Sequence, residues 1–361
     1  MSNPLHDLHG LGQAVWLDAI RRSWLGPEGR LAALRDADEI RGLTSNPTIF
    51  ADAFSEDDAY AAQLAELRGA DPREAFWALA MHDVGEACDL FRPVWDATDG
   101  VHGLVSIEVD PTKAFDTDAT IDEGLQLARS LDRPNLMVKV PGTEPGLPAI
   151  TRLLAEGVNV NVTLLFSVAR YEAVIDAFIQ GVRAHHEAGG DVRRLQSVAS
   201  FFVSRVDGKV DPLLGDDHPR RGAAAVANAR LAYEAFRTRL PNDGGPDDPL
   251  ADIPGAHPQR PLWASTSTKD PQYRATKYVE ALAGPDTVNT MPPATVDATR
   301  SGADIADRLS GTAEHARQEL DALAADGVDL DQVTKELETE GVEKFEASFE
   351  EAVATVSHHL D

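Results

Sequence analysis

Short apolar runs recur along the chain and alternate with longer segments in which apolar residues lie three and four positions apart. Apolar runs that helices follow are typical of parallel strands covered on both faces. The helical periodicity is clearest in residues 57–95, with a break near 69–71, and in 116–131, 144–156, 167–186 and 222–240. The runs that predict strands are residues 14–18, 39–43, 104–111, 135–140, 158–166, 195–202, 261–266 and 287–292.

Eight predicted strands that alternate with helices favour an α/β fold, a (β/α)8 TIM barrel. A helix over residues 4–11 precedes the first strand, and three acidic helices are predicted in 303–361. These last helices are expected to pack on the barrel or to form a subunit contact. The acidic, proline- and glycine-rich residues 241–258 predict a mobile surface loop. Residues 1–361 are therefore interpreted as a single barrel domain with additional N- and C-terminal helices.

A lysine interrupts one of the apolar runs. Lys139 lies at the carboxyl end of its predicted strand, just before Pro141-Gly142, and in a parallel barrel that end carries the chemistry. No acidic residue is adjacent to it in sequence, so burial is expected to lower the pKa of its ammonium group. A partly neutral lysine forms a Schiff base with a carbonyl substrate. The alternative is a lysine that extends from the strand end into water.

Polar residues at the ends of other predicted strands favour the functional interpretation of Lys139. They are Asp18, Asn46, Glu108, Asn161, Thr163 and Ser200. Asp18 is equally well explained as the N-cap of a following helix. Ser45 or Asn46 is expected to cap the helix that Pro47 begins, which leaves the other residue free for a ligand. Glu108 interrupts a buried run, so it requires a polar pocket or a water molecule.

Composition narrows the classes of function. The chain has 361 residues, 43% of them hydrophobic and 26% charged, which indicates a soluble globular protein. The single cysteine, Cys88, excludes an intramolecular disulfide and a cysteine-based zinc site. A formal net charge of −27 argues against nucleic acid and anionic membranes as partners, and an anionic substrate would need a local basic pocket. We expect a cytoplasmic protein, because neither an apolar run long enough to span a membrane nor a leader segment is found.

Several motifs resemble those of a known family. They are LTSNPTIF (43–50), VSIEVDP (105–111), MVKVPGT (137–143), VNVTLLFS (160–167), WAST (263–266) and DTVNTMP (286–292). With these motifs, which extend over nearly the whole predicted barrel, the chain resembles the transaldolases. It is most similar to the longer bacterial branch, whose members occur alone or fused to a phosphoglucose isomerase.

The resemblance implies roles for the polar residues at the strand ends. Lys139 would be the Schiff-base lysine that attacks C2 of a ketose phosphate. Asp18 would accept the proton of the C4 hydroxyl as the C3–C4 bond breaks, and Glu108 would act through a water held by Thr163. The protonated imine is the electron sink, so the resemblance implies neither a cofactor nor a metal. The donor hydroxyls would be held by Asn46, Asn161 and Ser200.

The implied reaction belongs to the non-oxidative pentose phosphate pathway. A dihydroxyacetone unit passes from sedoheptulose 7-phosphate to D-glyceraldehyde 3-phosphate, which gives erythrose 4-phosphate and fructose 6-phosphate. Arg205 matches the phosphate-binding arginine of the family. The second phosphate-binding arginine of shorter members is not found, so Ser265 and Lys269 are expected to take its place. The expected partners are sugar phosphates, with a monomeric or homodimeric chain.

Two alternatives stay open. The first is a fructose-6-phosphate aldolase, a lyase that releases the three-carbon unit to water. Such enzymes usually carry a tyrosine where this chain has Phe202, and an apolar wall there favours transfer because it gives the carbanion no ready proton. The second is a non-catalytic barrel that binds sugar phosphates, which would be expected to have lost Lys139, Asp18 or Glu108; all three are present.

Overall fold

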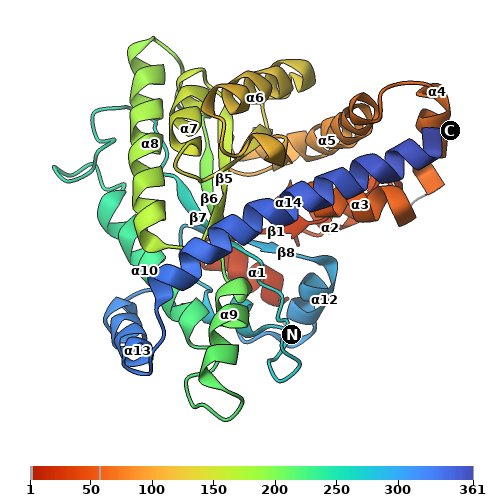
Figure 1. Ribbon diagram of the computed structural model, residues 1–361. Coiled ribbons are helices and arrows are strands. Elements are labelled where there is room, and N and C mark those ends of the chain that lie inside the picture. Colours follow the sequence, from red (N-terminus) through yellow and green to blue (C-terminus); the bar gives the residue numbers. More distant parts are fainter. Residues whose placement is uncertain (1–2, 57, 361) are drawn as a thin grey trace.

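Eight parallel strands close into a barrel in the computed structural model, which describes residues 3–56 and 58–360 (Figure 1). The strands follow chain order around the barrel, and β1 pairs with both β2 and β8. This arrangement confirms the predicted TIM barrel. The strands are Gln13–Asp18 (β1), Gly42–Thr44 (β2), Leu104–Glu108 (β3), Leu136–Pro141 (β4), Asn159–Leu165 (β5), Ser197–Phe202 (β6), Arg260–Ala264 (β7) and Thr287–Met291 (β8).

Helices connect the strands and cover the outside of the barrel. The predicted break near 69–71 is confirmed, and the start predicted at residue 57 lies outside the described residues. Within the two described ranges, no helix combines the length and the apolar character that a membrane span requires. The helices are Pro4–Gly10 (α1), Arg30–Asp36 (α2), Pro47–Glu56 (α3), Ala61–Glu66 (α4), Pro72–Ala97 (α5), Thr117–Leu131 (α6), Gly146–Ala155 (α7), Val168–Glu187 (α8), Ser204–Leu214 (α9), Ala224–Arg239 (α10), Lys277–Ala281 (α11), Pro293–Gly302 (α12), Ala313–Ala325 (α13) and Leu330–Leu360 (α14). The 3₁₀ turns of the described residues are Arg22–Trp24 (η1), Asp58–Tyr60 (η2) and Pro111–Lys113 (η3).

The second strand begins later than predicted. Residues 39–41 lie outside β2, and the buried Glu39 pairs with Arg300 at 2.5 Å between Oε2 and Nη2. The strand starts instead at Gly42, where the backbone passes close to Trp16. A Cβ atom at Gly42 would lie 2.6 Å from the indole ring, so a side chain does not fit there.

Alternation along each strand sends side chains to two layers. On β4, Val138 faces outward and packs against α6, whereas the next residue, Lys139, faces the inside of the barrel. The register places Lys139 between Glu108 on β3 and Asn161 on β5. Polar side chains from three adjacent strands therefore lie at one level of the barrel.

The long helix α14 crosses the carboxyl ends of the strands (Figure 1). It packs against α3, α5 and α9, and its Phe349 is fully buried with its ring 4.9 Å from that of Phe76. Burying one such ring stabilises the fold by about 2–3 kcal/mol. Ion pairs fasten the same helix to the barrel helices, with Arg170 to Glu338 at 3.2 Å as one example.

Two helices, α13 and α14, occupy the described part of 303–361, where three were predicted. Residues 303–312 are mainly irregular, and α14 continues without a break for 31 residues. It passes through Gly341, where a Cβ atom would lie 3.1 Å from Leu164 and 3.4 Å from Phe166. The glycine thus lets the helix lie close to the barrel, so it serves packing instead of ending the helix.

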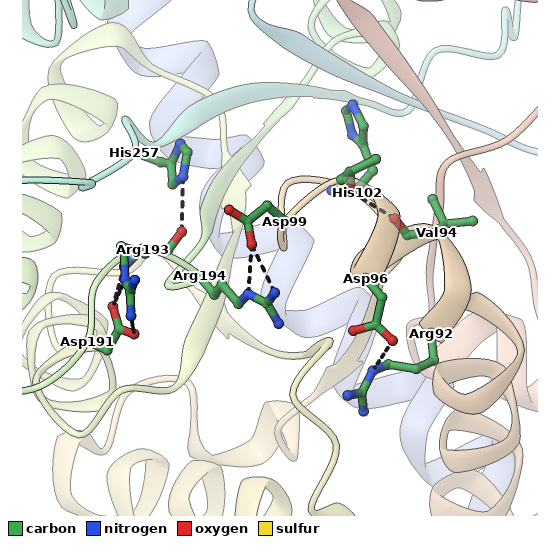
Figure 2. A network of polar contacts seen from close by, with 10 residues as sticks. Arg92, Val94, Asp96, Asp99, His102, Asp191, Arg193, Arg194 and His257 are labelled. Carbon is green, nitrogen blue, oxygen red and sulfur yellow. Dashed lines mark hydrogen bonds and ion pairs between the residues drawn. The ribbon is translucent and has the colours of Figure 1, made fainter.

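The loop predicted at 241–258 lies before β7, at the amino ends of the strands and so opposite α14. Arg183 on α8 holds this loop by an ion pair of 2.8 Å with Asp252. Figure 2 shows neighbouring contacts at the same end of the barrel, where the Arg194 guanidinium pairs with Asp99 and His257 Nε2 lies 3.1 Å from the Arg193 carbonyl oxygen. The mobility of the loop stays a prediction.

Candidate active site

A cavity of about 320 Å³ opens at the carboxyl ends of the strands, beneath α14. This is the end at which barrel enzymes carry their chemistry. Most of the polar residues predicted from the strand ends line it, whereas Glu108 and Asn161 lie behind its wall. The predicted residues on the wall are Asp18, Asn46, Lys139, Thr163, Ser200, Phe202, Arg205, Ser265 and Lys269.

Lys139 and Glu108 form a buried ion pair in which Nζ lies 3.0 Å from Oε2, with 5% and 2% of the side chains exposed. Lys139 Nζ also donates a hydrogen bond of 3.3 Å to the Ser45 carbonyl oxygen. The expected burial of a lysine without a counter-ion was therefore wrong, because the acid comes from the neighbouring strand and not from the neighbouring sequence. A carboxylate at this distance is placed to accept a proton from the amine.

The two carboxyl groups of the site, those of Glu108 and Asp18, lie close to positive charges. Burial raises the pKa of the Glu108 carboxyl, and the adjacent Lys139 opposes this rise. Burial also raises the pKa of Asp18, against the pull of Lys139, Lys269 and Arg205. A carboxyl group with a raised pKa holds and releases protons nearer neutral pH, as a general acid or base must.

Asp18 does not cap a helix. β1 ends at Asp18, and η1 follows only at Arg22, with Arg21 in the cap position. Its side chain makes no hydrogen bond or ion pair with the residues that the structure describes, and it points into the cavity. The alternative interpretation as an N-cap was therefore wrong.

Thr163 lies where β5 is irregular. The register between β5 and β6 shifts between Val162 and Leu165, and Leu164 has a φ of 61°, in the left-handed region. Such bulges turn side chains toward functional sites. Thr163 Oγ1 and Glu108 Oε1 are both buried and find no hydrogen-bond partner among the described residues.

Asn161 is held from two sides. Its Nδ2 donates to Ser106 Oγ at 3.0 Å, and its Oδ1 accepts from Ser200 Oγ at 2.7 Å. Ser200 lies on the cavity wall, so Asn161 orients it from behind. Buried polar side chains with all partners in place specify one arrangement of a site.

Asn46 is the capping residue of the pair Ser45-Asn46. Its Oδ1 accepts a hydrogen bond of 3.1 Å from the Ile49 amide at the start of α3, whereas Ser45 Oγ donates to the Ser106 carbonyl oxygen at 2.8 Å. Ser45 is fully buried and Asn46 lines the cavity, so the capping residue is also the one that faces the cavity.

Arg205 lies between two aromatic rings. Its Cζ is 5.0 Å from the ring centre of Phe202 and 5.8 Å from that of Phe345. Burial lowers the pKa of Arg205, with Glu108 and Asp18 opposing that shift. Within the described chain its guanidinium makes no hydrogen bond or ion pair, so all its donors are available to an anion.

Ser265 and Lys269 lie on the segment that follows β7. Ser265 has a φ of 56°, and its Oγ is 2.9 Å from Ser204 Oγ on α9. Lys269 Nζ donates to Ser267 Oγ at 3.0 Å. The structure thus brings both residues, which the family resemblance had singled out, to the same cavity as Arg205.

The sequence interpretation missed the contribution of α14. Lys344 and Phe345 line the cavity, and the ring centre of Phe345 is 5.6 Å from Lys139 Nζ. The only local sign of a role for Lys344 was that this lysine stands among glutamates, and such a pattern is common on exposed helices. Among the described residues, no group of three or more His, Cys, Asp or Glu side chains is arranged to hold a metal ion.

Comparisons with known proteins agree with this geometry. The family model described as Transaldolase/Fructose-6-phosphate aldolase matches residues 15–356. The chain is 51% identical to a curated transaldolase of Acidothermus cellulolyticus, over 100% of this chain and 98% of the relative. It is 49% identical to one of Saccharopolyspora erythraea, over 99% and 98% of the two chains. A third, from Thermobifida fusca, is 48% identical over 100% of this chain and 99% of its own.

Proposed function

The chain belongs to the Transaldolase/Fructose-6-phosphate aldolase family and is an enzyme with transaldolase function, and we propose that Lys139 forms the Schiff base of the reaction. The observation that carries this proposal is the buried ion pair of Lys139, which lines the cavity, with Glu108 behind it. The substrates are sugar phosphates. In the proposed direction a dihydroxyacetone unit passes from sedoheptulose 7-phosphate to D-glyceraldehyde 3-phosphate.

The first step needs a neutral amine. Glu108 Oε2, 3.0 Å from Nζ, takes a proton from Lys139, and the amine then attacks C2 of the ketose. The amine hydrogen moves to the C2 oxygen, Glu108 then returns its proton to that oxygen, and its loss as water gives the protonated imine. Glu108 Oε1 and Thr163 Oγ1, which are buried and have no hydrogen-bond partner among the described residues, are the groups that would hold this water.

The second step breaks the C3–C4 bond. Asp18 accepts the proton of the C4 hydroxyl, the aldehyde leaves, and the electron pair of the broken bond passes to the imine. When the acceptor aldehyde is attacked, Asp18 returns the proton. Its position on the cavity wall at the end of β1 and its raised pKa support this role.

Polar groups on the wall would orient the donor. We assign Asn46 and Ser200 to its hydroxyl groups, and Asn161 holds Ser200 in place. Arg205 would bind the phosphate group, because its planar guanidinium has no partner among the described residues and is the preferred fork for an oxyanion. Ser265 and Lys269 complete this side of the cavity.

Phe202 favours transfer over release to water. Its ring lines the cavity and packs on Phe166 at 5.3 Å between ring centres. A phenyl ring has no proton to give, so the carbanion survives until an aldehyde arrives. The lyase alternative is therefore not the one favoured here.

We propose further that the enzyme acts in the cytoplasm, because charged phosphate esters do not cross membranes unaided. The net charge of −27 supports the absence of a nucleic acid partner. A monomer or homodimer stays the predicted state, and membership of the longer bacterial branch also stays a prediction.

Mass spectrometry after incubation with fructose 6-phosphate and borohydride tests the central step. Borohydride reduces an imine to a stable amine, so the wild-type chain should gain a dihydroxyacetone adduct on Lys139 and the Lys139→Ala variant should gain none. Glyceraldehyde 3-phosphate should be released from fructose 6-phosphate in turnover amounts only when an acceptor aldehyde such as erythrose 4-phosphate is present. An adduct elsewhere in the chain, or none, would refute the proposed mechanism.

A further inference from the structure

Three cations without a counter-ion line one cavity in a strongly acidic chain. Most arginines and lysines form ion pairs, but Arg205, Lys269 and Lys344 form none with any carboxylate of the described residues. Like charges that face one cavity repel each other, so the arrangement is stabilised when an anion binds among them.

Lys344 lies on α14, which follows the last strand of the barrel and is not one of the helices between the strands. The next residue, Phe345, lies near both Lys139 and Arg205. These contacts fix the rotation of α14 about its own axis above the cavity. Partial burial and the nearby Arg205 and Lys269 lower the pKa of Lys344. Lys344 and Lys269 are exposed at the rim of the cavity, and Arg205 lies deeper.

Neighbours on the helix do not neutralise Lys344. Glu340, one turn earlier, would be its natural partner on a helix surface. The Glu340 carboxylate instead pairs with Lys209 on α9. One turn later, Ser348 accepts a hydrogen bond of 2.8 Å from Thr48 on α3.

Acidic residues also face the cavity but pair with none of the three cations. Asp18 lies at the end of β1, and Asp52 lies exposed on α3. Ion pairs hold α14 on both sides of Lys344, through Glu336 to Lys209 at 2.8 Å and through Glu350 to Arg73. The position of Lys344 is therefore set before a ligand arrives.

We propose that Lys344 binds the phosphate group of the sugar substrate together with Arg205 and Lys269, so that the C-terminal helix takes part in substrate recognition. This inference rests on the proposed function, in which Arg205 meets the phosphate. Lys344 thereby adds a third positive charge to those of Arg205 and Lys269.

Calorimetry with glucitol 6-phosphate tests the inference without the chemistry, because this sugar alcohol has no carbonyl group and forms no imine. The Lys344→Met variant should bind it about tenfold more weakly than wild type, and Lys344→Arg should recover most of the affinity. Lys335→Met is the matched control, since Lys335 lies exposed on the same helix, lines a different cavity and forms no ion pair with the described residues. It should bind like wild type.

Borohydride trapping with unphosphorylated dihydroxyacetone completes the test. The concentration of dihydroxyacetone that gives half-maximal trapping should be the same in Lys344→Met and in wild type, because this donor has no phosphate group. Equal weakening for both ligands, or no weakening for the phosphate, overturns the inference. A wild-type chain that binds glucitol 6-phosphate through Lys344 but forms no adduct on Lys139 would refute the proposed function and leave this inference standing.

Discussion

Glu108 Oε2 lies 3.0 Å from Lys139 Nζ, and the two residues are direct partners in the register of β3 and β4. The pair is buried, so each charge depends on the other for the compensation that water would otherwise give. The same contact serves stability and the proposed proton transfer. Substitutions can separate these two effects.

Replacing Glu108 by glutamine keeps the shape and removes the charge. We expect the rate of imine trapping to fall about 10²- to 10³-fold, because the amine loses its proton acceptor. The free energy of unfolding should fall by about 3 kcal/mol, because a buried ammonium is left unpaired. Urea unfolding and single-turnover trapping check the two effects.

The double variant Glu108→Gln/Lys139→Met is the control for stability. It removes both charges at once, so it should be more stable than Glu108→Gln alone. If the single and double variants unfold at the same urea concentration, the pair contributes nothing to stability.

Asp18→Asn should separate the formation of the imine from cleavage. The variant should still gain a borohydride adduct from dihydroxyacetone, because Lys139 and Glu108 are intact. Turnover of fructose 6-phosphate should fall by about 10³-fold, since the C4 hydroxyl has lost its base. Adduct masses and the rate of glyceraldehyde 3-phosphate release with erythrose 4-phosphate as acceptor are the measurements, and a variant that turns over normally would exclude Asp18 as the base.

Stability should decrease in mild acid through two histidines at the amino ends of the strands. Burial lowers the pKa of His9 to about 4 and that of His102 to about 3. Between pH 6.5 and 4 the unfolded chain therefore binds more protons than the folded chain, and the free energy of unfolding falls as the pH falls. The loss is on the order of 3 kcal/mol per histidine when the folded pKa is reached, and none is expected above pH 7.

The His102→Gln variant isolates the contribution of His102 to the loss of stability in acid. Its free energy of unfolding, measured in urea from pH 7 to 4, should depend less steeply on pH than that of wild type. Carboxylates titrate in the same range in both proteins, so the difference in slope is the readout. Parallel curves for the two proteins would show that His102 does not contribute.

Shortening the acidic loop should leave catalysis intact. The loop lies at the amino ends of the strands, opposite the cavity, and Arg183 anchors it beyond residue 248 through Asp252. Replacing residues 242–247 with two glycines should change kcat/KM by less than about twofold, as is usual for surface loops remote from a site. A comparable deletion in 266–272 should raise KM, because that segment carries Lys269. Equal effects of the two deletions would contradict this assignment.

The barrel was predictable because its signals are local. Each strand is a short apolar run, and the polar residue that ends or interrupts it, such as Lys139 or Glu108, can be recognised one strand at a time. Once β7 is recognised, the loop at 241–258 is known to precede a strand, and it therefore lies at the amino ends of the strands. The start of β2 was missed because its cause, the close approach of Gly42 to Trp16, is tertiary.

Contacts between elements were less predictable. The 3.0 Å approach of Glu108 to Lys139 depends on the register of two strands, which the apolar pattern of each strand does not reveal. Lys344 and Phe345 belong to a helix whose own pattern indicates only that one face is buried. Where that face docks depends on shape, including the space that Gly341 leaves beside Leu164.

The order of synthesis gives α14 a further consequence. The ribosome makes all the barrel strands before it makes α14, so a nascent chain that has completed β8 carries Lys139 under an open mouth. In a barrel that has folded before α14 is made, aldehydes and ketones of the cell would reach that amine without the cover that the last helix provides. Chains that stall before residue 344 would keep this exposed amine for their lifetime, and they would be the ones most prone to unselective modification by sugars.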